Sequence, residues 1–168
     1  MDKNIVLIGM PGVGKSTIGV ILAKLLGYRF VDTDIVIQEE EKKLLKEIIA
    51  EKGTEGFIET ENRIIKGLKA ERSVIATGGS AVYGAEAMKN LSDDGIVIYL
   101  KLDYSKLRYR LGNIKNRGVV IREGQSLSGL YKERAHIYEK YADIIIDENS
   151  CNVEKTIIKI LDALDEYL

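Results

Sequence analysis

The sequence predicts one α/β domain, in which five strands form a parallel sheet and helices cover both of its faces. Short, continuous apolar runs alternate along the chain with segments whose apolar residues recur at helical spacing. Continuous apolar runs are typical of strands buried on both faces in a parallel sheet. A length of 168 residues, 45% of them hydrophobic, suits one compact domain. Because no repeat, linker or low-complexity tract divides the chain, we expect a single domain over residues 1–168.

The composition favours small partners in a reducing compartment. The formal net charge of −1 gives no general attraction to nucleic acid or to an acidic membrane. The single cysteine, Cys151, excludes an internal disulfide, and the single histidine, His136, leaves no cysteine–histidine cluster for zinc. No apolar run approaches the ~20 residues of a membrane span, and no signal peptide is visible. We therefore expect a cytoplasmic monomer that binds neither nucleic acid nor membrane.

The predicted elements alternate in a regular order. The predicted strands cover residues 4–8, 29–31, 73–76, 95–100 and 143–147. The predicted helices cover residues 17–26, 35–52, 55–68, a segment that ends before 112, a segment around 127–141, and 153–168. Gly27 is placed to end the first helix, and Gly53 to separate the second from the third. The order of strand and helix is that of an α/β layer fold.

The stretch from Gly9 to Thr17 carries the strongest functional signal. It reads Gly-Met-Pro-Gly-Val-Gly-Lys-Ser-Thr and fits the pattern G-x-x-x-x-G-K-[S/T], with a predicted strand before it and a predicted helix after it. Its glycines let successive backbone N–H groups face a phosphate, while Lys15 reaches the β- and γ-phosphates and Ser16 can ligate Mg²⁺. We therefore predict a nucleotide site. Its residues are Gly12, Val13, Gly14, Lys15, Ser16 and Thr17.

Two aspartates follow the second predicted strand. In extended chain, Asp32 and Asp34 would point the same way, because side chains alternate with a period of two. They lie at the end of the strand where open α/β sheets bind ligands. One carboxylate can then hold Mg²⁺ and the other can engage a substrate hydroxyl. The alternative is that both only cap the next helix, and the residues alone leave this open.

Further candidates come from a glycine pair and from two inward charges. Gly78 and Gly79 follow the third predicted strand, where they permit close approach to a ligand or only form a tight turn. Glu61 and Arg134 each fall within the apolar arc of a predicted helix. An inward carboxylate needs a partner, and an inward arginine binds an anion unless its stem lies along the core surface. For Arg134 that anion is either a protein carboxylate such as Glu61 or a substrate carboxylate.

The segment 112–118 reads Gly-Asn-Ile-Lys-Asn-Arg-Gly and interrupts the helical pattern. It adds cations, as a lid that closes over phosphates would.

The order and spacing of these motifs resemble the shikimate kinase family over essentially the whole chain. The resemblance rests on the phosphate loop, on Asp32-Thr33-Asp34, on Ala76-Thr77-Gly78-Gly79, on Arg110 seven residues before Arg117, and on Glu133-Arg134-Ala135-His136-Ile137-Tyr138. It implies a three-layer P-loop NTPase fold with a five-stranded parallel sheet of the nucleoside-monophosphate-kinase type. It also implies a substrate-binding region at about 33–61 and a mobile lid at about 112–124. The implied reaction moves the γ-phosphate of ATP to a hydroxyl of shikimate, a step of aromatic amino-acid synthesis.

The resemblance assigns a role to each candidate of the nucleotide half. Lys15 and Arg117 would act on the transferred phosphate, with Arg117 as the lid arginine. Ser16 and Asp32 would organise Mg²⁺, and Arg110 would lie over the adenine. Catalysis would then consist of positioning and charge neutralisation around an in-line transfer.

In the acceptor half, the resemblance implies that Asp34 holds the accepting hydroxyl and is placed to deprotonate it. Gly78 and Gly79 would offer backbone groups to the substrate, and Arg134 would bind the substrate carboxylate.

Three departures from the family pattern lie in the acceptor half and the lid. A substrate-facing arginine of the family is Ile58 here, the last of three glycines is Ser80, and the lid's Arg-Pro-Leu-Leu is Arg117-Gly118-Val119-Val120. Loss of one of two carboxylate-binding arginines should cost about 2–4 kcal/mol of binding. Two alternatives therefore stay beside a shikimate kinase: a kinase for another hydroxylated or amino-bearing acceptor, and a nucleotide-binding regulatory module without turnover. Glu61 lacks its family partner, so we also expect a cation to answer it, either Arg134 or an amino group of the substrate.

Overall fold

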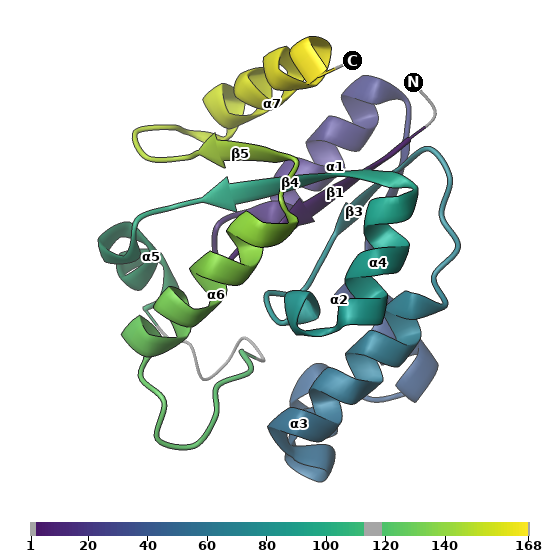
Figure 1. Cartoon of the computed structure of the whole chain (residues 1–168), viewed down its shortest axis with the longest axis vertical. Helices are drawn as coiled ribbons and strands as arrows, with labels where there is room; N and C mark the ends of the chain where they lie inside the picture. Colours follow the sequence, from purple (N-terminus) through teal and green to yellow (C-terminus); the bar gives the residue numbers. More distant parts are fainter. Residues whose placement is uncertain (1–2, 113–118, 168) are drawn as a thin grey trace.

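The computed structural model describes residues 3–112 and 119–167, which form a five-stranded sheet with helices on both faces (Figure 1). The strand order is β2-β3-β1-β4-β5, and every pair of neighbours is parallel. The strands are β1 (Asn4–Ile8), β2 (Arg29–Asp32), β3 (Ser73–Ala76), β4 (Gly95–Lys101) and β5 (Ile144–Asp147). The predicted α/β fold is confirmed, and each predicted strand is found within one residue of its expected bounds.

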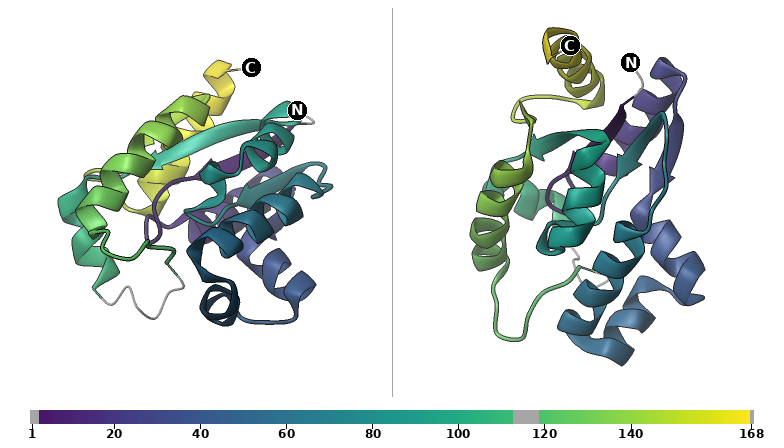
Figure 2. Two further views of the ribbon diagram at one scale, coloured as in Figure 1. Left: turned by 60° about the horizontal axis from the view of Figure 1, so that its bottom comes forward. Right: turned by 45° about the vertical axis from the view of Figure 1, so that its right-hand side comes forward.

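The helices form the two outer layers. They are α1 (Lys15–Leu26), α2 (Thr33–Glu41), α3 (Leu45–Lys66), α4 (Ala85–Asp93), α5 (Tyr104–Leu111), α6 (Leu127–Tyr141) and α7 (Val153–Tyr167), with a short 3₁₀ turn, η1 (Ala81–Tyr83), before α4. Helices α1 and α7 contact each other on one face, whereas α4 and α6 pack on β4 from the other (Figures 1 and 2). Helices α2 and α3 extend below the carboxyl ends of the strands in Figure 1.

The core lies where the central strands meet both helical layers. All five residues of β1 are buried, and the first six of β4 are buried as well. Burial on both faces explains why these strands are continuous apolar runs in the sequence. A second, smaller cluster lies between α2 and α3 and reaches the segment after residue 119. Its buried residues are Ile37, Ile48, Phe57, Ile64 and Val120.

The helical bounds depart from the prediction in one region. The chain leaves the helix at Lys42, whose φ of 55° caps α2, and α3 then runs from Leu45 through Gly53 to Lys66. The predicted single helix over 35–52 is therefore wrong. Gly53 does interrupt the backbone, with φ 71° and ψ 179°, but as a kink within α3. Helix α4 and the turn η1 were not predicted at all.

In the described part of the chain, no helix is both long enough and apolar enough to span a bilayer.

Candidate active site

The loop between β1 and α1 is built around its glycines. Gly9 has φ 147°, and a Cβ at this position would lie 2.7 Å from the carbonyl oxygen of Leu100. Gly14 has φ 99° and caps α1, which begins at Lys15. Only glycine adopts these two conformations without strain. The loop therefore has the backbone that the sequence motif predicts, followed directly by a helix N-terminus.

Lys15 folds back over this loop. Its ammonium group donates to the carbonyl oxygens of Gly9 at 2.7 Å and of Met10 at 2.8 Å, and the residue is 7% exposed. Burial lowers the pKa of Lys15 to about 8, although the negative charge of Asp34 opposes the shift. A phosphate at the loop would restore the positive charge that burial disfavours.

Asp32 has two partners: one confirms that it caps α2, and the other leaves its Mg²⁺ role a prediction. Its Oδ2 accepts from the hydroxyl of Ser16 at 2.8 Å, and its Oδ1 accepts from the backbone N–H of Asp34 at 3.0 Å, which caps α2. A hydroxyl and a carboxylate in contact at a phosphate loop are the protein ligands that Mg²⁺ takes beside phosphate and water. The described residues contain no group of three or more acidic, histidine or cysteine side chains that could hold a metal. The pair therefore fits a Mg²⁺ bound jointly with a nucleotide.

Asp34 points elsewhere, because it lies in the first turn of α2. The expectation that Asp32 and Asp34 extend side by side from a strand is wrong. Helix α2 begins at Thr33, so the aspartates diverge, one toward Ser16 and the other toward Gly78. Burial, followed by the nearby charge of Asp32, raises the pKa of Asp34 to about 6 against the opposing charge of Lys15.

Gly78 and Gly79 bring three charged side chains close together. A methyl group at Gly78 would lie 2.7 Å from Asp34 Oδ1 and 2.9 Å from Glu61 Oε2. A methyl group at Gly79 would lie 2.9 Å from Arg134 Nη1 and 2.7 Å from Pro11. Both glycines thus lie in close contact with charged side chains of the site, and their approach to a ligand stays a prediction.

Three side chains from three helices hold this loop. Thr33 Oγ1 of α2 accepts from the backbone N–H of Gly78 at 3.2 Å. The Tyr138 hydroxyl of α6 donates to the carbonyl oxygen of Gly79 at 2.6 Å, and the Ser80 hydroxyl donates to Glu61 Oε1 of α3 at 2.6 Å. The position of the loop thus depends on partners far away in sequence.

The expected Glu61–Arg134 ion pair is absent, although both residues are described and each is 1% exposed. Arg134 donates instead to the carbonyl oxygen of Val120 at 2.7 Å and to the Tyr83 hydroxyl at 3.4 Å. The hydrogen-bond partner of Glu61 is the hydroxyl of Ser80, which carries no charge. Of the two candidate cations, Arg134 therefore forms no ion pair with Glu61, and an amino group of the substrate stays a prediction.

One cavity of about 470 Å³ joins these features. At one end it is lined by the phosphate loop, including Lys15 and Ser16. At the other end it has a polar wall of Asp34, the 78–80 loop and Arg134, and an apolar wall. The apolar wall consists of Leu45, Phe57, Val119 and Val120. The site can therefore hold a nucleotide phosphate and a small, partly apolar acceptor in contact.

The remaining predicted residues lie at the nucleotide end or outside the described chain. Arg110 of α5 donates to the carbonyl oxygen of Val13 at 3.5 Å, which places it beside the phosphate loop. Arg117 and Gly118 lie outside the described residues, so the predicted lid is described only at its edges.

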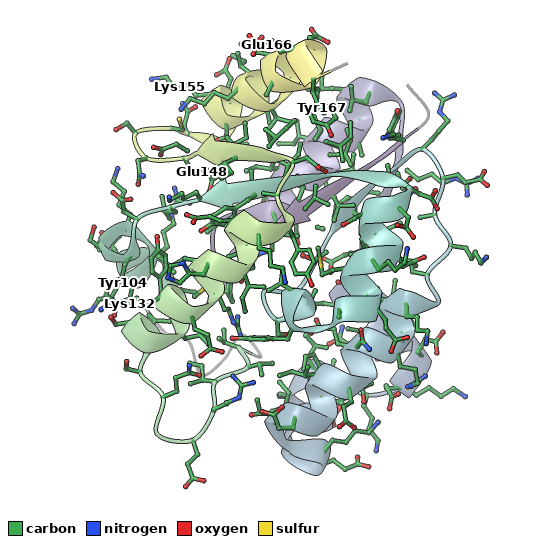
Figure 3. All side chains as sticks on the ribbon, in the orientation of Figure 1. Tyr104, Lys132, Glu148, Lys155, Glu166 and Tyr167 are labelled. Atoms are coloured by element: carbon green, nitrogen blue, oxygen red, sulfur yellow. The ribbon has the colours of Figure 1, made fainter. Side chains whose placement is uncertain are left out.

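Sequence reasoning missed several residues of the site. Glu148 follows β5 directly (Figure 3) and is 3% exposed, with Arg110 and Lys15 among the charges that act on it. The strand-end rule that singled out Asp32 applies equally to this residue. Thr33, Tyr83 and Tyr138 had no signal in the sequence, because their partners are distant along the chain.

The fold and the cavity together define a P-loop kinase that phosphorylates a small molecule. A phosphate loop at the end of a central parallel strand faces a polar pocket of acceptor size, with an aspartate between them. The sequence model of the family Shikimate kinase matches residues 11–165, and on that evidence the chain belongs to the shikimate kinase family.

Curated relatives and solved structures agree with this membership. A shikimate kinase from Clostridium botulinum is 38% identical, with 98% of each chain covered. One from Actinobacillus pleuropneumoniae is 40% identical, with 96% of this chain and 97% of that protein covered. The structure of a shikimate kinase from Acinetobacter baumannii in complex with shikimate superposes with a TM-score of 0.86 at 32% identity, covering 98% of this chain and 94% of that one.

Proposed function

We propose that this protein transfers the γ-phosphate of ATP, with Mg²⁺, to a hydroxyl of shikimate and so forms shikimate 3-phosphate. The observation that carries the proposal is that one cavity is lined by the phosphate loop, Asp34 and Arg134 together. Shikimate offers a carboxylate for the arginine, hydroxyls for the aspartate and a ring face for the apolar wall. The family membership supports ATP as donor.

In the nucleotide half, the backbone of the phosphate loop and Lys15 bind the phosphates. Lys15 carries the charge that stabilises the transferring group. Ser16 and Asp32 would hold Mg²⁺, which supplies charge neutralisation at the β- and γ-phosphates when bound. Arg110, which contacts the loop at Val13, belongs to the nucleotide side. We retain Arg117 as the lid arginine on the basis of the family resemblance.

In the acceptor half, Asp34 accepts the hydrogen bond of the reacting hydroxyl and takes its proton as the O–P bond forms. Arg134 binds the carboxylate, which fixes the orientation of the ring. The hydrogen bonds from Tyr138 and to Thr33 hold Gly79 and Gly78 against the acceptor. Rate enhancement then comes from orientation, since a poised hydroxyl converts a bimolecular encounter into an intramolecular step.

The test is ATP-dependent product formation with shikimate, followed by ³¹P NMR and mass spectrometry. We expect one phosphate monoester and stoichiometric ADP, and a loss of at least about 100-fold in kcat for Lys15→Ala with an unchanged far-UV circular dichroism spectrum. Lys24→Ala, on the exposed side of α1, is the matched control. ATP consumption without phosphorylated shikimate would overturn the choice of acceptor.

A second acceptor class is favoured by one observation. Ile58, at the position of the family's substrate-facing arginine, is partly buried against the apolar cluster of α2 and α3, and among the described residues that line the cavity the cations are Lys15 and Arg134. A panel of small hydroxylated acids and amino alcohols, assayed beside shikimate, separates the two classes by kcat/KM.

The single-domain organisation, the monomeric state and the cytoplasmic location belong to the same proposal, together with the lack of nucleic-acid or membrane partners.

A further inference from the structure

Glu61 is a buried carboxyl group whose two oxygens have different surroundings. Oε1 accepts the hydrogen bond of Ser80 at 2.6 Å. Oε2 is fully buried, has no hydrogen-bond partner among the described residues, and faces the space beside Gly78 that Asp34 Oδ1 also borders. No ion pair links Glu61 to any cation in the described part of the chain. Among the described residues, the hydroxyl of Ser80 is thus the one hydrogen-bond partner of the Glu61 carboxyl group.

Few charges face this carboxyl group from the elements around it. Helix α2 contributes Asp34, and helix α6 contributes Arg134 and the phenol of Tyr138. The buried face of α4, which packs on α3, carries Ala87, Met88 and Leu91. The turn η1 contributes Tyr83, whose hydroxyl is committed to Glu133 and Arg134.

An ionised carboxylate in this place would be poorly stabilised. It would be desolvated, paired with one hydroxyl, and adjacent to a second carboxylate at Asp34. Arg134 acts on it only through space, because its guanidinium is bonded to Val120 and Tyr83. Burial is the largest cause of the shift that raises the pKa of Glu61 to about 8, and Asp34 adds to it, whereas Ser80 and Arg134 oppose it.

We infer that Glu61 is a positioning residue that must be a neutral carboxylic acid for the acceptor's carboxylate to bind at Arg134. This inference rests on the function proposed above. When Glu61 loses its proton, the new charge attracts Arg134 from the adjacent pocket wall and repels an anionic acceptor. When Glu61 is neutral, Asp34 is the one carboxylate that opposes Arg134 on that wall, and the guanidinium is free to bind the acceptor's carboxylate. The proton on Glu61 therefore selects for an anionic acceptor without touching the reacting atoms.

The first experiment measures the KM for shikimate from pH 6.5 to 9.5 at saturating ATP and Mg²⁺. If only the protonated form binds, the KM rises about tenfold between pH 7 and pH 9, in inverse proportion to the protonated fraction. In Glu61→Gln, an amide oxygen still accepts from Ser80 but nothing titrates, so the KM for shikimate stays constant within about twofold. Lys15 has a pKa of about 8 in the protein without nucleotide, and at saturating ATP the bound phosphates favour its charged form in both proteins alike.

The matched control is Glu148→Gln, a buried carboxyl group at the nucleotide end. This variant keeps the tenfold rise in the KM for shikimate if the inference holds. If Glu148→Gln loses the rise in the KM for shikimate and Glu61→Gln keeps it, the pH dependence belongs to Glu148 and the inference is overturned.

The second experiment does not depend on turnover. Selective ¹³C labelling of glutamate side chains, with Glu61→Gln to assign the signal, gives the titration midpoint in the unliganded protein. We expect a midpoint near pH 8, and a higher one in Ser80→Ala because a stabilising donor is removed. A midpoint below about pH 6 overturns the inference. A midpoint near 8 with a flat KM profile overturns the link to Arg134. Failure to phosphorylate shikimate, with the midpoint confirmed, refutes only the proposed acceptor.

Discussion

At the scale of single residues, Asp34 is the side chain that the proposed function places between the acceptor and the nucleotide. It lies in the cavity beside Gly78, and its negative charge raises the pKa of Lys15 against the effect of burial. We expect Asp34→Asn to lower kcat by at least about 100-fold, because the amide cannot take the proton of the reacting hydroxyl. The KM for ATP should change less than about threefold. Isothermal titration with a non-hydrolysable ATP analogue, beside steady-state rates, checks both. Equal losses in both quantities would assign Asp34 to the nucleotide or metal site.

Ile58 is the second residue at which substitution is informative. It is one helical turn before Glu61 on α3. An arginine there would pair with the Glu61 carboxylate and cancel its charge, which leaves Arg134 to the acceptor, and it could also contact the acceptor's carboxylate. We expect Ile58→Arg to lower the KM for shikimate by about tenfold or more, because the substitution adds one charged contact to the acceptor's carboxylate. Ile58→Lys is the control for charge without the bidentate geometry. If the natural protein already has a low KM and Ile58→Arg brings no gain, another cation serves the acceptor.

At the scale of elements, helix α3 depends on the kink at Gly53. Its φ of 71° and ψ of 179° lie in a region that is essentially restricted to glycine. A Cβ there would meet no atom within 4 Å, so Gly53→Ala measures backbone strain alone. We expect a loss of about 1–3 kcal/mol in the free energy of unfolding, measured with urea.

The matched control for this kink is Gly27→Ala. Gly27 also has free space around it, but its φ of 67° and ψ of 34° belong to the left-handed helical region. This variant should lose about 1–2 kcal/mol. We expect the larger loss of unfolding free energy at Gly53, because its backbone conformation is the less accessible to alanine. A larger loss in Gly27→Ala than in Gly53→Ala would contradict this order. Gly53→Ala should also raise the KM for the acceptor, because the part of α3 after the kink carries Phe57 and Glu61.

The elements that the sequence predicted well are those with local signals. Strand β1 and helix α1 lie next to a glycine-rich motif, and a continuous apolar run or an end glycine fixed their bounds. The break between α2 and α3 was missed because Lys42 caps α2 in a left-handed conformation inside a charged run, without glycine or proline. Prediction also failed for the partners of Glu61 and Arg134. Ser80 and Val120 are distant in sequence from the side chains they meet, and no periodicity reports such contacts.

At the scale of the whole molecule, the stability should depend on pH through buried carboxyl groups. Burial raises the pKa of Glu148 from 4.5 to about 7, in spite of Arg110 and Lys15. Because the folded state keeps this proton longer than the unfolded chain, the associated stability is complete below pH 4.5 and is lost as the pH rises through 7. At most about 3 kcal/mol is involved.

We therefore expect the melting temperature of the natural protein to fall between pH 5 and pH 8 relative to that of Glu148→Gln, as measured by calorimetry. Glu154→Gln, on the exposed first turn of α7, should follow the natural protein at every pH. Parallel curves for the natural protein and Glu148→Gln would show that Glu148 is already ionised at pH 5.

The strand order has a consequence for synthesis on the ribosome. Strand β1 leaves the exit tunnel first, yet its hydrogen-bonding neighbours are β3 and β4, at residues 73–76 and 95–101. At about 5–20 residues per second, the first apolar strand waits roughly 3–14 seconds before β3 is made. During that interval both edges of the apolar strand β1 are unpaired and can bind other nascent chains nearby. The yield of folded enzyme in a cell should accordingly depend on how quickly the middle of the message is translated.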